Sequence, residues 1–426
     1  MAISITQRPS TILDTYPVYD PVIYVVKETS VGTYKFSYTC VIEHYNGSTY
    51  VAAATLRIPK NSEDVGVFDV AEILQAYFTH TLPGESSAIM APADSAQKFK
   101  FTFGSEQAGT ATGAPIANAS TVVDSDQLFY SGQALRDTSG YAENNNNSFA
   151  LDNSATDRML TSSGWPQYNP RYDVRADEKG SIDFVYDQTT DAATKVRISY
   201  YGASGVLSTT DITLATYATG TAQENAVMRF YCYPKDLDDH GTGPVRPSDA
   251  GNSGWTRYTL QFRDALNESV AHTFHLTDVC APQELRFQWL NQFGGWEQMY
   301  TTGNWRVRNT YTDKKYETVR GNWFTTSGTT NFSYSAQDRG TNRMVTSLQR
   351  TFNVATGVRI KEDNGAIESL LRSRSVFVTN PESESPTLLP CVINAKSLNV
   401  IEQFHPEIRE YTFDMMLSNQ PQPMTL

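Results

Sequence analysis

The sequence has little charge for its length, and the charge it has is mostly acidic. Only 19% of its 426 residues are charged, and the formal net charge is −12. Nucleic-acid binders usually present a basic surface, because contacts to phosphates supply much of their affinity. The composition therefore predicts no direct, sequence-specific partner of nucleic-acid type.

Cysteines are few and scattered. The four of them do not form a CxxC pair or any other cluster with the spacing of zinc ligands. Such isolated cysteines are typical of buried free thiols in a chain that folds in a reducing compartment. They are Cys40, Cys232, Cys280 and Cys391.

Long hydrophobic runs are also missing. No stretch of the sequence approaches the 18 or so uninterrupted apolar residues that a membrane-spanning helix needs. The first residues lack the basic segment followed by an apolar segment that marks a secretory signal. We therefore expect a chain that is made in the cytoplasm and has no membrane span.

The motifs that carry common chemistry are absent from the sequence, which has no HExxH, Gly-x-Ser-x-Gly, phosphate-binding loop or GxGxxG. His272 and His275 fall in a predicted strand, where their spacing places them on opposite faces and disfavours a shared metal. Asp236, Asp238 and Asp239 resemble part of a calcium loop but lack its glycine and distal glutamate. We predict no catalytic residue, no cofactor and no metal, and hence no enzyme.

Aromatic residues, by contrast, are abundant, with 24 Tyr and 20 Phe, and they favour pleated, half-buried strands. Residues from Thr33 to Glu43 alternate between apolar and polar, the Asn46-Gly47 pair is a hairpin signal, and Tyr50–Ile58 provides a return strand. Similar short segments recur as far as Glu410–Leu417. The sequence predicts an all-β fold of two or three β-sandwich or barrel domains, with long loops and one or two short helices.

Two segments have the pattern of short helices. Asp69–Phe78 has an apolar face, and Asp69 with Glu72 three residues later forms a potential capping box at its start. Gly365–Leu371 is the second candidate. A helix of this length is expected to close one end of a sandwich.

Changes in composition suggest four regions. Small and polar residues dominate between Gly104 and Arg175, which indicates loops or arms, and Lys98–Phe103 alternates like an outer strand. Asp236–Ser253, rich in Gly, Pro and Asp, is predicted to be a loop. The predicted regions are an N-terminal β-sandwich (1–105), a loop-rich insertion or arm (106–178), a second β domain (179–277) and a C-terminal β domain with a tail (278–426).

One motif connects the sequence to a known class of proteins. The segment Cys280–Glu297 contains Leu-Asn-Gln-Phe-Gly-Gly-Trp-Glu at 290–297. It resembles uncharacterised virion proteins of tailed phages, often of Bacteroidetes-type hosts, in which a strand ends in Leu-Asn-x-Phe-Gly-Gly-aromatic-Glu/Asp. Ile5–Pro9, Asp20–Tyr24 and Gly66–Val70 are similar in kind. The resemblance covers separate islands, transfers no catalytic residue, and implies a tail, neck or ring component.

The resemblance and the aromatic content together suggest an assembly protein. Such a protein would be located in the virion and would bind copies of itself and other virion proteins, through interfaces rich in aromatic side chains. The candidate interface residues are Trp289, Asn291, Phe293, Trp296, Trp305 and Trp323.

Two other functions remain open at this stage. A carbohydrate- or receptor-binding adhesin would expose Trp and Tyr as a platform for a host surface glycan. A polysaccharide-degrading enzyme would place two carboxylates in a groove, and these can lie far apart in the sequence. The sequence alone does not identify such a pair.

Overall fold

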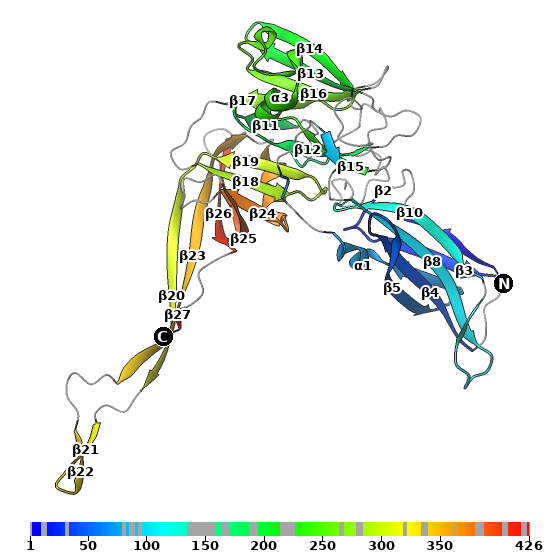
Figure 1. Ribbon diagram of the computed structural model, residues 1–426, viewed down its shortest axis with the longest axis horizontal. Coiled ribbons are helices and arrows are strands. Elements are labelled where there is room, and N and C mark those ends of the chain that lie inside the picture. Colours follow the sequence, from blue (N-terminus) through cyan, green and yellow to red (C-terminus); the bar gives the residue numbers. More distant parts are fainter. Residues whose placement is uncertain are drawn as a thin grey trace. The chain divides into compact units, whose positions relative to one another are not determined.

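A computed structural model shows an all-β protein with a few short helices (Figure 1). It falls into two compact units: unit 1 is 1–279, 288–299 and 361–375, and unit 2 is 280–287, 300–360 and 376–426. The structure describes residues 2–9, 15–29, 34–78, 82–84, 90–92, 96–118, 120–133, 159–163, 170–186, 195–213, 226–263, 268–277, 284–317, 322–333, 340–360, 363–379, 387–402, 408–418 and 424–425.

Unit 1 begins with a β-sandwich of two sheets. The smaller sheet has the order β1-β3-β6, and the larger one has the order β2-β10-β8-β4-β5, with β9 paired to β8. The strands are β1 (Ile3–Gln7), β2 (Thr15–Pro17), β3 (Ile23–Glu28), β4 (Tyr34–Tyr45), β5 (Tyr50–Pro59), β6 (Val65–Asp69), β8 (Ala96–Ala108), β9 (Ile116–Ala117) and β10 (Val122–Tyr130).

The predicted alternation in β4 is confirmed, and it explains how the sandwich closes. Phe36, Tyr38, Cys40 and Ile42 are buried, and they join Phe101 and other side chains from both sheets in one core. Because successive strand residues point to opposite faces, every second side chain of β4 reaches this core. The hairpin to β5 also forms as predicted, with a left-handed glycine in its turn.

Two expectations for this region are wrong, and a third, the helix at 69–78, is right in position but wrong in length and cap. β8 is not an outer strand, because β10 and β4 pair with its two sides. β10 lies within the predicted loop region, and a register shift between Asp124 and Gln127 interrupts the alternation that would have revealed it. Helix α1 covers only Ala71–Gln75, and Asp69 accepts a hydrogen bond from the backbone N–H of Ala71 without forming the predicted capping box.

A second pair of sheets follows in unit 1. The five-stranded sheet has the order β11-β17-β16-β13-β14, and the three-stranded sheet has the order β12-β15-β7. The strands are β7 (Met90–Pro92), β11 (Arg171–Val174), β12 (Ser181–Tyr186), β13 (Lys195–Gly202), β14 (Gly205–Thr213), β15 (Ala226–Tyr231), β16 (Arg257–Arg263) and β17 (His272–Leu276).

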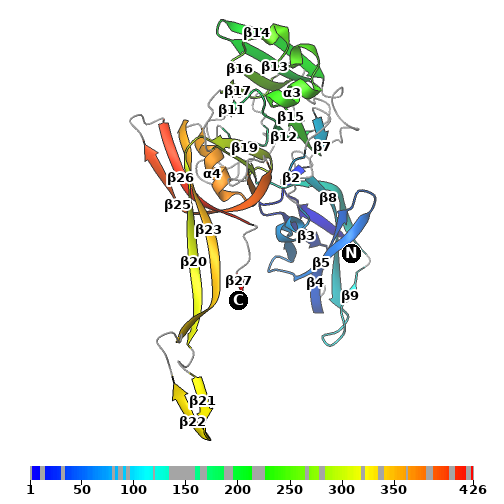
Figure 2. The same cartoon turned by 60° about the vertical axis from the view of Figure 1, so that its left-hand side comes forward.

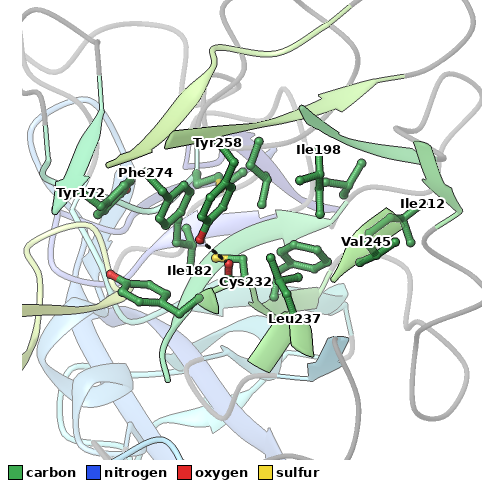
Figure 3. Close-up of a cluster of buried hydrophobic side chains, with 14 of the residues drawn as sticks. Tyr172, Ile182, Ile198, Ile212, Cys232, Leu237, Val245, Tyr258 and Phe274 are labelled. Atoms are coloured by element: carbon green, nitrogen blue, oxygen red, sulfur yellow. Dashed lines mark hydrogen bonds between the residues drawn. The ribbon is translucent and has the colours of Figure 1, made fainter. Parts of the chain in front are cut away.

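The core between these two sheets is strongly aromatic (Figure 3). The rings of Tyr258 and Phe274 stack with centroids 4.6 Å apart, and the Tyr258 hydroxyl donates to the Cys232 carbonyl over 2.7 Å. Leu237 enters the same core from helix α3 (Pro234–His240). This helix lies where a loop was predicted, and its proline sits in the first turn, where a missing N–H is tolerated.

The largest sheet has eight strands with the order β19-β18-β24-β25-β26-β23-β20, in which β27 pairs with β23. A separate hairpin joins β21 and β22. β25 and β27 were not predicted. The strands are β18 (Leu285–Leu290), β19 (Trp296–Thr301), β20 (Trp305–Glu317), β21 (Asn322–Thr326), β22 (Thr329–Ser333), β23 (Thr341–Ile360), β24 (Val376–Thr379), β25 (Leu388–Glu402), β26 (Ile408–Leu417) and β27 (Met424–Thr425).

The prediction of buried free thiols is confirmed for three of the four cysteines. Cys40, Cys232 and Cys391 are free and buried. Cys280 lies outside the described residues. Burial raises the pKa of the Cys40 and Cys391 thiols to about 12, so both are protonated at neutral pH.

We expect Tyr258→Phe to lower the free energy of unfolding by about 1–3 kcal/mol, because the Cys232 carbonyl would lose a buried hydrogen-bond donor. Tyr201→Phe on the adjacent strand is the control, since among the described residues its hydroxyl has no hydrogen bond to lose, and it should change stability by less than about 0.5 kcal/mol. Urea denaturation measures both. Equal stabilities of the two variants would contradict this role of the hydroxyl.

Candidate functional site

The motif at 290–297 forms a tight turn between β18 and β19. The Asn291 Oδ1 accepts hydrogen bonds from the backbone N–H groups of Phe293, at 2.9 Å, and Gly295, at 3.0 Å. Its Nδ2 donates to the Leu160 carbonyl over 2.8 Å. One amide side chain therefore closes the turn and also attaches it to a segment that lies far away in the sequence.

The two glycines allow the turn to contact other backbone directly. Gly294 has a φ of +88°, a left-handed conformation, and a Cβ there would lie 2.5 Å from the Ser131 carbonyl oxygen. A Cβ on Gly295 would overlap the Leu160 carbonyl oxygen. The backbone of the motif is thus packed against two other segments at distances that only glycine permits.

Two further contacts join the motif to both sandwiches of unit 1. The Gln133 N–H donates to the Gln292 carbonyl over 2.9 Å, just after the end of β10. The Trp296 N–H donates to the Asp183 carboxylate over 3.2 Å. The motif therefore acts as a joint, which we call the Asn291 joint (residues 290–297).

A buried ion pair supports the joint. Asp183 is 0% exposed, and both of its carboxylate oxygens accept from the Arg229 guanidinium, at 2.8 and 3.0 Å. Two parallel hydrogen bonds of this kind fix the geometry as well as compensating the charge. The paired carboxylate still has a lone pair for the Trp296 N–H.

The candidate interface residues mostly lie inside the chain. Large aromatic side chains are stabilised by burial in the chain's own core. Four of the candidates are each less than 6% exposed: Trp289, Asn291, Phe293 and Trp296. They leave almost no surface for another molecule. Trp305 is half-buried and packs edge-on against Phe352. Trp323 belongs to β21, and its side chain lies outside the described residues.

A polar network that sequence reasoning missed surrounds Glu297. Its carboxylate is buried and accepts hydrogen bonds from the Thr161 hydroxyl, from the Ser162 hydroxyl and from the backbone N–H groups of Ser162 and Ser163. Burial raises the pKa of Glu297, while these donors act in the opposite direction. The run of small polar residues at 161–163 was the only available signal, and it has no distinctive pattern.

The network continues to His272, one of the two histidines whose spacing disfavours a shared metal. The Tyr172 hydroxyl lies 2.8 Å from the Thr161 hydroxyl and 3.3 Å from the His272 Nδ1. Burial lowers the pKa of His272 to about 3, so the imidazole is neutral at physiological pH. Because the Tyr172 hydroxyl donates its proton to Thr161, the neutral His272 ring is expected to carry its proton on Nδ1 and to donate it to the Tyr172 oxygen.

The three carboxylates of the acidic cluster already have protein partners. Asp236 is buried and accepts from the Gly180 N–H at 2.7 Å, Asp238 accepts from the Ser248 N–H, and Asp239 pairs with Lys235. The carboxylates that resemble part of a calcium loop therefore already bind other groups of the protein. Within the described ranges, no three His, Cys, Asp or Glu residues are placed to hold a metal ion, and no helix there is long and apolar enough to cross a membrane.

A long antiparallel ribbon formed by β20 and β23 exposes most of the side chains of β20. The two strands run antiparallel from the Trp305–Val354 pair to the Glu317–Thr341 pair, and Figures 1 and 2 show them extending side by side. None of the thirteen side chains of β20 is buried. Val307, Tyr311 and Tyr316 are 42%, 65% and 47% exposed.

Comparisons with known proteins add no assignment. No protein-family model matches this sequence, and no curated protein matches it significantly. The resemblance of the Asn291 joint to virion proteins therefore stays a prediction.

We expect Gly295→Ala to destabilise the protein by about 1–3 kcal/mol, or to prevent folding, because the added methyl group overlaps the Leu160 carbonyl. Gly109→Ala is the matched control, since a Cβ there meets no atom within 4 Å. Thermal unfolding followed by circular dichroism measures both variants. An unchanged melting temperature for Gly295→Ala would show that the backbone approach is not required.

The buried His272 should make the protein sensitive to acid. Its pKa is about 3 in the folded chain and about 6.5 when unfolded, so the unfolded chain binds the extra proton between these values. Stability therefore falls with decreasing pH across that window, by at most about 1.4 kcal/mol per pH unit.

Between about pH 6.5 and about pH 5, urea denaturation should show a change in stability that is more unfavourable by about 2 kcal/mol in the parent chain than in His272→Gln. Glu297, with its raised pKa, contributes with the opposite sign, but it is present in both proteins and cancels from the comparison. The same pH dependence in both proteins would refute the assignment.

Proposed function

We propose that this chain is a structural component of a tailed-phage virion, in the tail, neck or ring, and that it works by binding copies of itself and other virion proteins. We assign it no catalytic role. The exposed β20–β23 ribbon is the observation that carries the proposal. The resemblance of the Asn291 joint supports the virion setting.

A ribbon of this kind favours a partner. Beyond the part of β23 that pairs with β26, only the short strand β27 joins β20 and β23, and a two-stranded ribbon alone is marginally stable in water. Within the described residues, β20 is also the last strand in the order of its sheet, so one of its edges is open to pairing with another strand. Val307 and Tyr311 add apolar surface for such a contact.

The charge of the ribbon suggests which surface it contacts. β20 and β23 together carry seven Lys or Arg and two acidic residues, whereas the whole chain has a net charge of −12. Opposite potentials guide association and select the register of two surfaces. A basic ribbon on an otherwise acidic chain therefore favours head-to-tail contact between copies, which forms a ring when the rotation closes.

The ribbon can be shortened without touching the strand pairs of β26. Replacing 310–349 by Asn-Gly joins Asn309 to Arg350, which already face each other, and keeps the β23–β26 pairs from Phe352 onward. We expect the parent chain to sediment as an oligomer and this variant as a folded monomer. Raising the salt concentration should also weaken the parent oligomer, because screening reduces attraction between exposed charges.

Ile116→Ser is the control, since it removes an exposed apolar side chain that is 72% exposed and lies outside the ribbon. Its mass in solution should equal that of the parent. A parent chain that stays monomeric at high concentration, or a shortened variant that still assembles, would contradict the proposed assembly. Antibodies against the chain should label purified phage particles, and their failure to do so would contradict the virion setting.

A further inference from the structure

A small pocket of about 260 Å³ lies beside the Asn291 joint, within unit 1. It is lined by the end of the first sandwich, by the motif and by the end of helix α4 (Asn364–Arg372). Two of its lining residues are arginines, and none is acidic. The lining residues that matter here are Tyr19, Ser131, Gln133, Gln292, Arg372 and Arg374.

Arg374 is held in place by an aromatic ring. Its guanidinium carbon lies 3.5 Å from the centre of the Tyr19 ring. This cation–π contact occupies the face of the guanidinium and leaves N–H groups on its edge to donate. Within the described part of the chain, no carboxylate forms an ion pair with Arg374.

Arg372 is the secondary charge of the pocket. It lies in the last turn of α4, where the helix dipole favours a cation, and its guanidinium is 3.9 Å from Glu368. Both of these side chains are more than half exposed, so the pair is weak. Arg374, which follows the helix, therefore contributes most of the positive charge that is available to a ligand.

A buried hydroxyl in the lining has no partner. Ser131 is 1% exposed, and its Oγ makes no hydrogen bond within the described residues. Buried hydroxyls are almost always hydrogen-bonded, and leaving one unpaired is costly. Ser131 also lines the pocket, but its Oγ is enclosed, so an oxygen ligand there reaches this hydroxyl only after the side chain rotates.

We propose that this pocket binds a carboxylate. Its volume is below the range of about 300–1,000 Å³ that is usual for sites of drug-sized ligands, which suits one small group such as an acidic side chain. A guanidinium presents its N–H groups as a planar fork, which matches the two oxygens of a carboxylate. Once its side chain rotates toward the ligand, the Ser131 hydroxyl adds a third donor. The inference does not rest on the proposed virion function.

The test uses the full chain with arginine side chains labelled by nitrogen-15, titrated with three probes and followed by NMR. The probes are the peptide acetyl-Gly-Glu-Gly-amide, free glutarate and inorganic phosphate. We expect both carboxylates to shift the Arg374 Nε signal, and the peptide to bind more tightly if the carboxylate comes from a protein. Phosphate that binds more tightly than either carboxylate would overturn the assignment.

Arg374→Gln should weaken carboxylate binding about tenfold, as expected for the loss of a charge-assisted pair. Arg57→Gln is the matched control, because it removes the same charge from an arginine outside the pocket that is 66% exposed. A second control is the peptide acetyl-Gly-Gln-Gly-amide, which lacks the carboxylate. Equal weakening by the two variants would show that only the overall charge of the chain matters, and a glutamine peptide that binds as well as the glutamate peptide would show that the carboxylate is not recognised. Either result would overturn the proposal.

Ser131→Ala separates binding from folding. Because the Ser131 hydroxyl has no partner, its removal should leave the melting temperature of the free chain unchanged or higher, while it weakens carboxylate binding about threefold or more. Tyr19→Leu provides a second variant that leaves both arginines in place but removes the stacking contact. Unchanged affinity in both variants would show that the pocket is not the binding site.

Discussion

The close backbone contact at Gly294 and Gly295 is the constraint on which the rest of unit 1 depends. Because neither residue has a side chain, the turn reaches the Ser131 and Leu160 carbonyls directly. Asn291 then ties the same turn to Leu160, and Gln292 accepts from Gln133. Segments more than a hundred residues apart in the sequence are thereby held by backbone atoms, which are less adaptable than side chains.

The polar groups around this joint add specificity more than stability. Burying the Asp183–Arg229 pair and the Glu297 carboxylate costs desolvation energy, which their hydrogen bonds offset only when each donor is in place. A misplaced strand would leave these charges buried without partners. The network therefore penalises alternative arrangements of the joint, and the same logic makes the Tyr172–His272 contact sensitive to protonation.

The sequence predicted the strands with regular alternation and the all-β class, because period-two burial is written directly into residues such as those of β4. It failed where local geometry departs from the pattern. The irregular register of β10 hid a central strand, and α3 begins at a proline in a loop-like segment. The candidate site was located in sequence but misinterpreted, since an aromatic motif does not reveal whether its burial is internal or between chains. Ser131 and Arg374 had no sequence signal at all.

The β20–β23 ribbon differs from these regions because burial does not explain the order of β20, none of whose side chains is buried. Fixing the backbone of one residue costs about 1–2 kcal/mol, so each cross-strand pair has two such costs to offset. A side-chain pair returns about 0.2–1 kcal/mol, and a hydrogen bond about 0.5–1.5 kcal/mol. The balance for an exposed ribbon is near zero or unfavourable, whereas contact with another surface adds about 25 cal/mol per Å² of apolar area. The exposed side chains of Val307 and Tyr311 are where that contribution would begin.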